Sequence, residues 1–546
     1  MQVKSVKSLS RLCECVILHN MKLFLSESDI VALMDNELDL ENNTNNPFDQ
    51  LPSNVVDGFL NFTCKSIFVF LVGDQYRPRA IEYLPLLITP HLTELEIPFM
   101  ACGKLDQRKK DTHYILRLAS VRSKQLKILR MRLMFYYDSA FPFHINLICK
   151  FSKLQVLDVS TDDLLSKLPR FPSAQDEFLH LLGQHCTELR ELSARYHPIT
   201  DAGIRGLCVI GNCRSIRLLN FYGCKAITNQ GIKTAFDNLP FLKILWNEAT
   251  IDGLAEIAQN AADQGLPIPK YALSALYILK GTVYKGGSLE KSVLLCPYIT
   301  KVDMTLMCDG IVKDADLVSL LSLKSLYILE IDQRKPLNFN EATFRYSGGI
   351  TFEGGVFPLL KKFGNSLKKL ELDVFFLDLD ILTIMQFCHK LQYLCLHMRS
   401  KFDRWPKEEE QKSGNKREIP ILKHLEELML CSDDSLHSFV PAEIVLTLLS
   451  SPLLSFISIK LLNNLTDKII RKATHVNSFR HLERLWLTHC NEVTKYGVNL
   501  FLQQNIPLKS LKLHRCDKIT FEDSIEWEET LTKNNWELEL EIRHPY

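Results

Sequence analysis

The chain has 546 residues, of which 46% are hydrophobic and 24% charged, a composition typical of a globular protein with a large core or several domains. Its 65 basic and 64 acidic side chains give a formal net charge of +1, so long-range electrostatics do not favour a nucleic acid or an anionic membrane as partner. Sixteen cysteines occur without a C-x-x-C pair, and no uninterrupted apolar segment is long enough for a secretory signal or a membrane span. We therefore expect a reduced, intracellular protein that binds no membrane.

The N-terminal segment, residues 1–65, is predicted to form a small all-α head. Apolar residues at helical spacing predict an amphipathic helix over residues 8–23, and a second helix is expected over residues 30–38. Pro52 stands where the first turn of a helix tolerates proline, and the apolar residues after it form the stripe of a third helix.

A repeated unit of the form L-x-x-L-x-L, with other apolar residues substituting, runs from residue 92 to the C-terminus. About fifteen units occur, most of them 24 to 35 residues apart, which is the spacing of leucine-rich repeats. The units begin at Leu92, Leu126, Leu154, Leu189, Ile216, Leu242, Leu273, Ile299, Leu326, Leu367, Leu391, Leu425, Leu454, Leu482 and Leu508.

This pattern predicts one α/β fold, a leucine-rich-repeat solenoid over residues 66–546. In each unit a short strand places alternate apolar residues in the core, and a helix returns on the outside, so each unit buries its core against its neighbours. The strands are expected to form a curved parallel sheet on the inside and the helices an outer layer. Thr200, Thr228 and Thr494, each followed three residues later by glycine, are predicted to cap these helices.

Two patterns in the head resemble boxes known from ubiquitin-ligase receptors. One is similar to the BC-box by which VHL-box and SOCS-box proteins bind elongin C, and the other to the companion box that selects cullin-2. The first pattern consists of Leu9, Cys13 and Ile17, and the second of Leu51, Pro52, Val55 and Phe59. Both lie in the segment outside the repeats, in the expected order.

A VHL-box head followed by leucine-rich repeats resembles the zyg-eleven/Zer-one family of substrate receptors for cullin-2 ubiquitin ligases. The resemblance implies that Leu9 enters the hydrophobic pocket of elongin C, that Cys13 packs against its rim, and that the second box faces the cullin. Family members that read N-terminal glycine do so with armadillo repeats. Because leucine-rich units here continue to Leu513, that specificity is not transferred.

Non-core positions of the strands are expected to line the concave face and to bind a client protein. The candidate residues are an acidic set, Asp303, Glu330, Asp332, Glu371 and Asp373, and a set with aromatic rings, Tyr393, His397, Phe456 and Trp486. Aromatic side chains beside charges are typical of protein-binding hot spots. The alternative is that some of these rings pack on one another or on inserted loops.

No sequence motif of an enzyme is present, so we expect no catalysis, cofactor or metal. The predicted function is therefore client recognition for a ligase that contains elongin B/C and cullin-2. Two alternatives remain open. The segment that begins at Leu51 also resembles the start of an F-box, which would bind a Skp-type adaptor and cullin-1, and the chain would otherwise be a plain leucine-rich-repeat scaffold.

Overall fold

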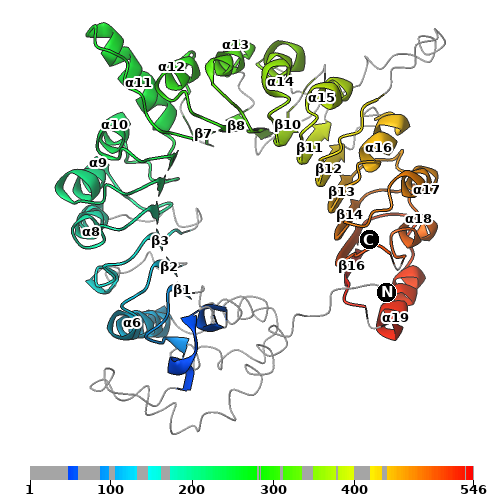
Figure 1. Cartoon of the computed structure of the whole chain (residues 1–546), viewed down its shortest axis with the longest axis horizontal. Helices are drawn as coiled ribbons and strands as arrows, with labels where there is room; N and C mark the ends of the chain where they lie inside the picture. The colour runs from blue at the N-terminus through cyan, green and yellow to red at the C-terminus, as the bar shows by residue number, and fades with distance from the viewer. Residues whose placement is uncertain are drawn as a thin grey trace. The chain divides into compact units, whose positions relative to one another are not determined.

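The structure is a computed structural model. It describes residues 47–58, 87–97, 105–131, 146–161, 172–279, 282, 284–307, 311–334, 349–374, 376, 379–398, 419–432 and 440–544, apart from residues 54, 504 and 535. The chain divides into two compact units: an N-terminal unit within Lys7–Leu273, and a C-terminal unit that includes Ser274–Lys280 and Tyr284–Tyr546 (Figure 1). Each unit is built around its own parallel sheet.

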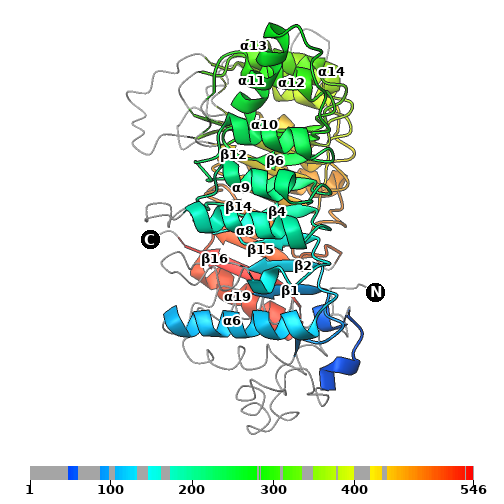
Figure 2. The same cartoon turned by 90° about the vertical axis from the view of Figure 1, so that its left-hand side faces the viewer.

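The N-terminal unit contains a six-stranded parallel sheet whose strands pair in chain order. The strands are β1 Glu94–Ile97, β2 Ile128–Met131, β3 Val156–Asp158, β4 Glu191–Ser193, β5 Leu218–Asn220 and β6 Ile244–Trp246. The helices are α6 Leu105–Arg122, α8 Pro172–His185, α9 Asp201–Arg205, α10 Asn229–Asn238 and α11 Thr250–Asp263. Figure 2 shows these helices stacked in chain order on one side of the sheet.

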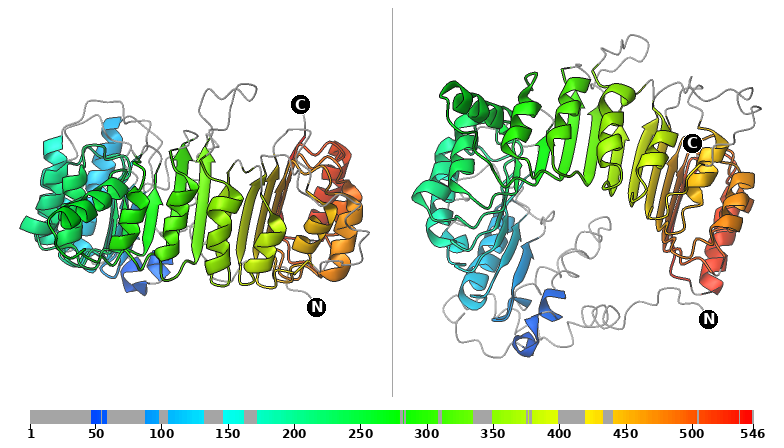
Figure 3. Two further views of the ribbon diagram at one scale, coloured as in Figure 1. Left: turned by 90° about the horizontal axis from the view of Figure 1, so that it is seen from above. Right: turned by 45° about the horizontal axis from the view of Figure 1, so that its top comes forward.

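The C-terminal unit contains a ten-stranded parallel sheet, also paired in chain order. The strands are β7 Ala275–Ile278, β8 Lys301–Met307, β9 Ile328–Arg334, β10 Lys369–Asp373, β11 Tyr393–Met398, β12 Glu427–Ser432, β13 Phe456–Lys460, β14 Arg484–Thr488, β15 Ser510–His514 and β16 Glu539–Arg543. The helices are α12 Ser288–Leu295, α13 Asp314–Ser319, α14 Phe357–Phe363, α15 Ile381–Phe387, α16 Ala442–Leu449, α17 Asp467–Val476, α18 Lys495–Asn499 and α19 Phe521–Lys533. They cover one face of the sheet, and none of the helices described by the structure lies on the other face (Figure 3).

The apolar positions of the repeat form the core of both units. In the unit at β2, for example, Leu126, Leu129 and Met131 are each at most 1% exposed, because the strand alternates its side chains between the core and the opposite face. The fifteen predicted units correspond to β1–β15, and the predicted α/β leucine-rich-repeat fold is confirmed. The boundary between a head at residues 1–65 and a solenoid at 66–546 stays a prediction.

The last strand, β16, was not predicted. Its core positions are Leu540 and Ile542, but the position that begins the other units is occupied by Glu537, so the leucine pattern is broken. The alternation of Trp536, Leu538, Leu540 and Ile542 with glutamates is the signal that could have revealed it.

Threonine caps join successive repeats. Thr200, Thr228 and Thr494 are N-caps whose hydroxyls accept hydrogen bonds from backbone amides of the first helical turn, as predicted. Each of these threonines also binds an aspartate that begins, or lies near the beginning of, the helix one repeat earlier. Thr200, for instance, donates its amide and its hydroxyl to Asp176 at 2.9 and 2.6 Å. These bonds fix the spacing between neighbouring helices.

Candidate functional site

The face of the ten-stranded sheet that the helices leave uncovered, here called the open face, carries three rows of side chains in register. The first row is Ala275, Lys301, Ile328, Lys369, Tyr393, Glu427, Phe456, Arg484, Ser510 and Glu539. The middle row is Tyr277, Asp303, Glu330, Glu371, Cys395, Met429, Ser458, Trp486, Lys512 and Glu541. The last row is Thr305, Asp332, Asp373, His397, Cys431, Lys460, Thr488, His514 and Arg543. All nine predicted client-binding residues belong to these rows.

The carboxylates of the first predicted set are interleaved with two lysines that sequence reasoning missed. Glu330 Oε2 lies 2.6 Å from Lys301 Nζ, and Glu330 Oε1 lies 2.5 Å from Lys369 Nζ. The same lysines reach Asp303 at 3.4 Å and Glu371 at 3.5 Å. This part of the open face is therefore an acid–lysine cluster rather than a purely acidic patch. The residue before the second leucine of each unit, which is lysine at 301 and 369, was the signal available in the sequence.

Burial and the contacts between these side chains shift the pKa values of Asp303 and Glu330 in opposite directions. Burial, together with the neighbouring Glu330, raises the pKa of Asp303 to about 6. Burial also raises the pKa of Glu330, but its two lysine partners outweigh that effect and bring the value below its ordinary range. At neutral pH, Glu330 is therefore a fixed anion between two cations, while Asp303 takes up a proton under mildly acidic conditions.

Tyr393, on β11, contacts the acid–lysine cluster at the cluster's C-terminal end in the strand order. Lys369 Nζ stands 4.2 Å from the centre of its ring, a cation–π contact. The Tyr393 hydroxyl lies 3.4 Å from Glu371 Oε2 and 3.1 Å from the sulfur of Met429. Burial, followed by the neighbouring Cys395 and Glu371, raises the pKa of Tyr393, so the hydroxyl stays protonated and can donate a hydrogen bond.

His397 and Asp373 form an ion pair on neighbouring strands, with 2.7 Å between His397 Nδ1 and Asp373 Oδ2. Burial lowers the pKa of His397, but the contact of its ring N–H with the Asp373 carboxylate and the neighbouring Cys431 outweigh burial and raise the value to about 9. The imidazole is therefore charged at neutral pH. Asp332 lies beside Asp373 in the same row.

A second group of side chains lies on β13–β16 and combines rings with cations. Phe456 and Trp486 pack edge to face with 4.8 Å between ring centres, and the Arg484 guanidinium lies 4.1 Å from the ring centre of Phe456. Lys512 Nζ lies 5.1 Å from the Trp486 ring and 2.9 Å from Glu541 Oε2. Phe456 is only 4% exposed, since its neighbours cover it, so Trp486 presents most of the aromatic surface.

The indole N–H of Trp486 makes no hydrogen bond with the residues that the structure describes. Its nitrogen atom, Nε1, is buried. Buried donors are nearly always satisfied, and one left without an acceptor costs about 1–3 kcal/mol. Trp486 stands four strands from Glu371, about 19 Å at the usual spacing of about 4.8 Å per strand. The two groups of side chains on the open face are therefore separate.

In the N-terminal unit, the structure describes three of the four residues of the pattern that resembles the cullin-selecting box, Leu51, Pro52 and Val55. Val56 is fully buried and Asp57 accepts hydrogen bonds from the Thr93 amide and hydroxyl at 3.3 and 2.7 Å, so the segment is anchored to the start of β1. Pro52 and Val55 point the other way: both are exposed, Val55 to 38%. Leu51 is half-buried. The remaining predicted adaptor-binding residues, Leu9, Cys13, Ile17 and Phe59, lie outside the described residues.

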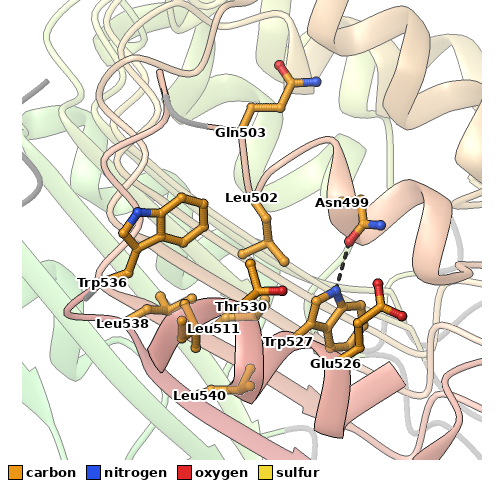
Figure 4. Close-up of a pocket in the computed structure, with 11 residues that line it drawn as sticks. Asn499, Leu502, Gln503, Leu511, Glu526, Trp527, Thr530, Trp536, Leu538 and Leu540 are labelled. Atoms are coloured by element: carbon orange, nitrogen blue, oxygen red, sulfur yellow. Dashed lines mark hydrogen bonds between the residues drawn. The ribbon is translucent and has the colours of Figure 1, made fainter. Parts of the chain in front are cut away.

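A pocket of about 320 Å³ lies at the end of the C-terminal unit and was not predicted (Figure 4). Its lining residues are Asn499, Leu502, Gln503, Leu511, Glu526, Trp527, Thr530, Leu531, Trp536, Leu538 and Leu540. The pocket forms where β16 covers the final core incompletely: the Trp527 ring is buried and its Nε1 donates to Asn499 at 2.8 Å, whereas Leu540 is only half-buried. The walls are mainly apolar.

No three His, Cys, Asp or Glu side chains of the described residues are placed to hold a metal ion. No described helix has the length and apolar character needed to cross a membrane.

No protein-family model matches the chain, and no curated protein matches it. Solved structures similar to it include a chain from the crystal structure of the Rad7 and Elc1 complex in yeast, with 13% sequence identity and a TM-score of 0.45 over 90% of this chain and 95% of that chain. The leucine-rich-repeat fold of the present chain is defined by its own strand order and registers.

Proposed function

We propose that the chain is the substrate-recognition subunit of an elongin B/C–cullin-2 ubiquitin ligase and that it holds a client protein on its open face. The head binds the adaptor and the cullin, and other subunits carry out ubiquitin transfer. Catalysis comes from proximity, because a tethered client presents its lysines to the conjugating enzyme at high effective concentration.

The observation that carries the proposal is the orientation of the segment at residues 51–57. Its buried side, Val56 and Asp57, fixes it to the first strand, and its opposite side, Pro52 and Val55, is exposed. The segment therefore presents an apolar side that a partner could contact. The exposed residues are those that the cullin-selecting pattern assigns to the partner, which supports an adaptor surface at this place.

The test is co-purification of the full chain with elongin B/C and cullin-2 and, separately, with a Skp-type adaptor and cullin-1. Wild type is compared with the double variant Leu9→Ser/Cys13→Phe and with Val55→Asp. The matched control is Ile210→Asp, which places the same charge on another exposed apolar side chain of the N-terminal unit. We expect stoichiometric elongin capture that the double variant loses, cullin-2 capture that Val55→Asp loses, and no effect of Ile210→Asp.

Other outcomes would change the assignment. Capture of the Skp-type adaptor alone, sensitive to Val55→Asp, would make the chain an F-box-like receptor of a cullin-1 ligase. Failure to capture either adaptor would overturn the ligase assignment and leave a leucine-rich-repeat binding scaffold.

The proposed client surface centres on Trp486, whose side chain is partly exposed and whose buried Nε1 donor has no acceptor among the described residues. Trp486→Phe retains the ring but removes this donor, whereas Trp486→Ala removes both. Once a client is identified, we expect affinity to fall about 5- to 30-fold for Trp486→Phe, equivalent to about 1–2 kcal/mol, and further for Trp486→Ala. Tyr298→Ala, on an exposed aromatic ring outside the three rows of the open face, is the control.

A further inference from the structure

The outer edge of β16 carries backbone groups that no described strand pairs with. β16 is the edge strand of the ten-stranded sheet, and among the strands that the structure describes its partner is β15. The amide of Glu539 and the carbonyl of Arg543 bond with the chain at either end of β15, so these residues and Glu541 between them face β15. In a parallel ladder the alternate residues face the other way. The amides and carbonyls of Leu540 and Ile542 are therefore open to a further strand.

The pocket described above lies directly beside this edge. Leu538 and Leu540 line it from β16 and the residue before it, and Trp527 and Leu531 line it from α19 (Figure 4). Its volume of about 320 Å³ is at the lower limit for ligand pockets, about 300 Å³, so a large side chain of a partner fits it better than a cofactor-sized molecule does. Side chains in register on neighbouring strands point to the same side of the sheet. A residue that paired with Leu540 on an added strand would thus point into the pocket.

Helix α19 extends the apolar surface beside the pocket. Phe521 and Ile525, one helical turn apart, are 65% and 41% exposed. They lie on the side of the helix opposite to Asp523 and Trp527, which contact α18. Phe521 packs edge to face on His544, directly after β16, with 5.9 Å between ring centres, so this side of α19 adjoins the outer edge of β16. We call the combined surface the end face; its residues are Phe521, Ile525, Leu538, Leu540 and Ile542.

The charges around the end face are mainly acidic. Glu528 and Glu529 of α19 are exposed and have no ion-pair partner among the described residues. Glu539 of β16 is 65% exposed. Nearby cations compensate only in part, because Arg543 forms an ion pair on its own strand and Lys533 lies in the last turn of α19. A second copy of the chain would bring like charges together on this face, whereas a basic partner complements it.

We propose that the end face binds an extended basic segment of a partner protein, which adds to β16 as a further strand. Main-chain hydrogen bonds to Leu540 and Ile542 hold the segment, and its apolar residues enter the pocket. Lysine or arginine side chains at the intervening positions reach Glu539, and those that flank the strand reach Glu528 and Glu529. The end face is distinct from the open face and does not rest on the ligase assignment.

The first test measures binding of a fluorescent peptide to the full-length chain by anisotropy. The probe has about eight residues, the length of a strand, in which leucine alternates with lysine. One control peptide has the same composition with its leucines in one block, and another carries glutamate in place of lysine. We expect the alternating basic peptide to bind at least about 10-fold more tightly than either control.

Variants of the chain locate the binding surface. Ile525→Ser removes an apolar contact and Glu528→Lys reverses a charge, and each should weaken binding about three- to tenfold. Val476→Ser, at an exposed apolar residue of α17, and Glu443→Lys, at an exposed acid of α16, are the matched controls and should leave binding unchanged. All four side chains are exposed, so these changes leave the core intact.

The second test follows strand addition by hydrogen exchange at single-residue resolution. At saturation the peptide should slow exchange of the Leu540 and Ile542 amides at least about 10-fold, whereas the amides of Glu539 and Glu541, which already face β15, should change less. The proposal is overturned if the peptide does not bind, if the block peptide binds equally well, or if Leu540 and Ile542 gain no protection.

The oligomeric state supplies one further outcome. Light scattering of the full-length chain should give a monomer at the end face. A dimer that Ile525→Ser dissociates would overturn the basic partner and assign the end face to contact between copies of the chain. None of these measurements involves elongin or cullin capture, so failure here is distinguishable from failure of the ligase assignment.

Discussion

Asp201 and Thr228 bind each other across the boundary between two successive repeats of the N-terminal unit. Thr228 donates its backbone amide to Asp201 Oδ1 at 2.8 Å and its hydroxyl to Asp201 Oδ2 at 2.6 Å. The same threonine hydroxyl accepts from the Gln230 amide and so caps α10. The arrangement recurs at Asp176–Thr200, Asp314–Thr351 and Asp467–Thr494. Each of these repeats is thus linked to the helix cap of the next.

Replacing the aspartate should loosen this link locally. We expect Asp201→Ala to lower the free energy of opening of α10 by about 1–2 kcal/mol, because it removes two hydrogen bonds to a carboxylate near the surface, where water restores part of the loss. Native-state hydrogen exchange of the amides at the start of α10 measures this directly. Asp263→Asn, which keeps an acceptor for Gln259 at an exposed site, is the control and should change exchange little. Equal protection in Asp201→Ala and wild type would show that the link contributes no stability.

The glycine three residues after the cap makes room for the same carboxylate. A Cβ atom on Gly231 would lie 2.2 Å from Asp201 Oδ1, although the helix would otherwise favour alanine. We expect Gly231→Ala to destabilise α10 by about 1–3 kcal/mol through this overlap. Gly286→Ala, at a glycine whose Cβ would meet nothing within 4 Å, should be neutral or slightly stabilising.

The double variant distinguishes steric overlap from a backbone effect. In an Asp201→Ala background the overlap with the carboxylate is gone and the nearest atom left is Ile204 Cδ1 at 3.2 Å, so adding Gly231→Ala should cost much less than it does in the wild type. The coupling between the two changes is read from the hydrogen exchange of α10 in the four chains of the cycle. Additive effects would contradict this account of the glycine.

Features that lie within one repeat could be predicted from the sequence, whereas contacts between repeats could not. The threonine caps, the glycines and the buried leucines belong to one repeat each, so a periodic pattern predicts them. The aspartate partner of Thr228 lies 27 residues earlier, and the lysine partners of Glu330 come from the repeats on both sides. Such contacts depend on how repeats stack and on strand register, which insertions of varying length obscure in the sequence. The open face was therefore predicted as a set of residues, but its ion pairs were not.

The charge on His397 gives a prediction about pH. A pKa raised from 6.5 to about 9 in the folded chain means that the ion pair with Asp373 stabilises the fold fully below about pH 6.5 and that this contribution is lost as the pH rises through about 9. Nuclear magnetic resonance of chains with labelled histidine Cε1, assigned with His397→Gln, should show this titration. Asp373→Asn should lower the midpoint by at least about one unit, since it removes the negative partner. Glu427→Gln, an acid of the first row without contact to His397, is the control, and an unshifted midpoint in Asp373→Asn would refute the assigned cause.

Asn477 gives a prediction about the core of the C-terminal unit. Its buried side chain donates to the carbonyls of Leu449 and Ser451 at 3.0 and 2.7 Å and accepts from the amide of Phe479 at 2.9 Å. It therefore links the turn between α17 and β14 to the turn that follows α16 in the preceding repeat. Leucine has a similar volume but would leave three buried backbone groups unpaired, and we expect Asn477→Leu to cost at least about 3 kcal/mol. Protection of the β13 and β14 amides against hydrogen exchange should fall accordingly. Asn534→Ala, at the exposed C-cap of α19 where the side chain donates to the Thr530 carbonyl, should cost less than about 0.5 kcal/mol because water replaces the bond. A similar loss in both variants would mean that burial of the asparagine is irrelevant to the turn.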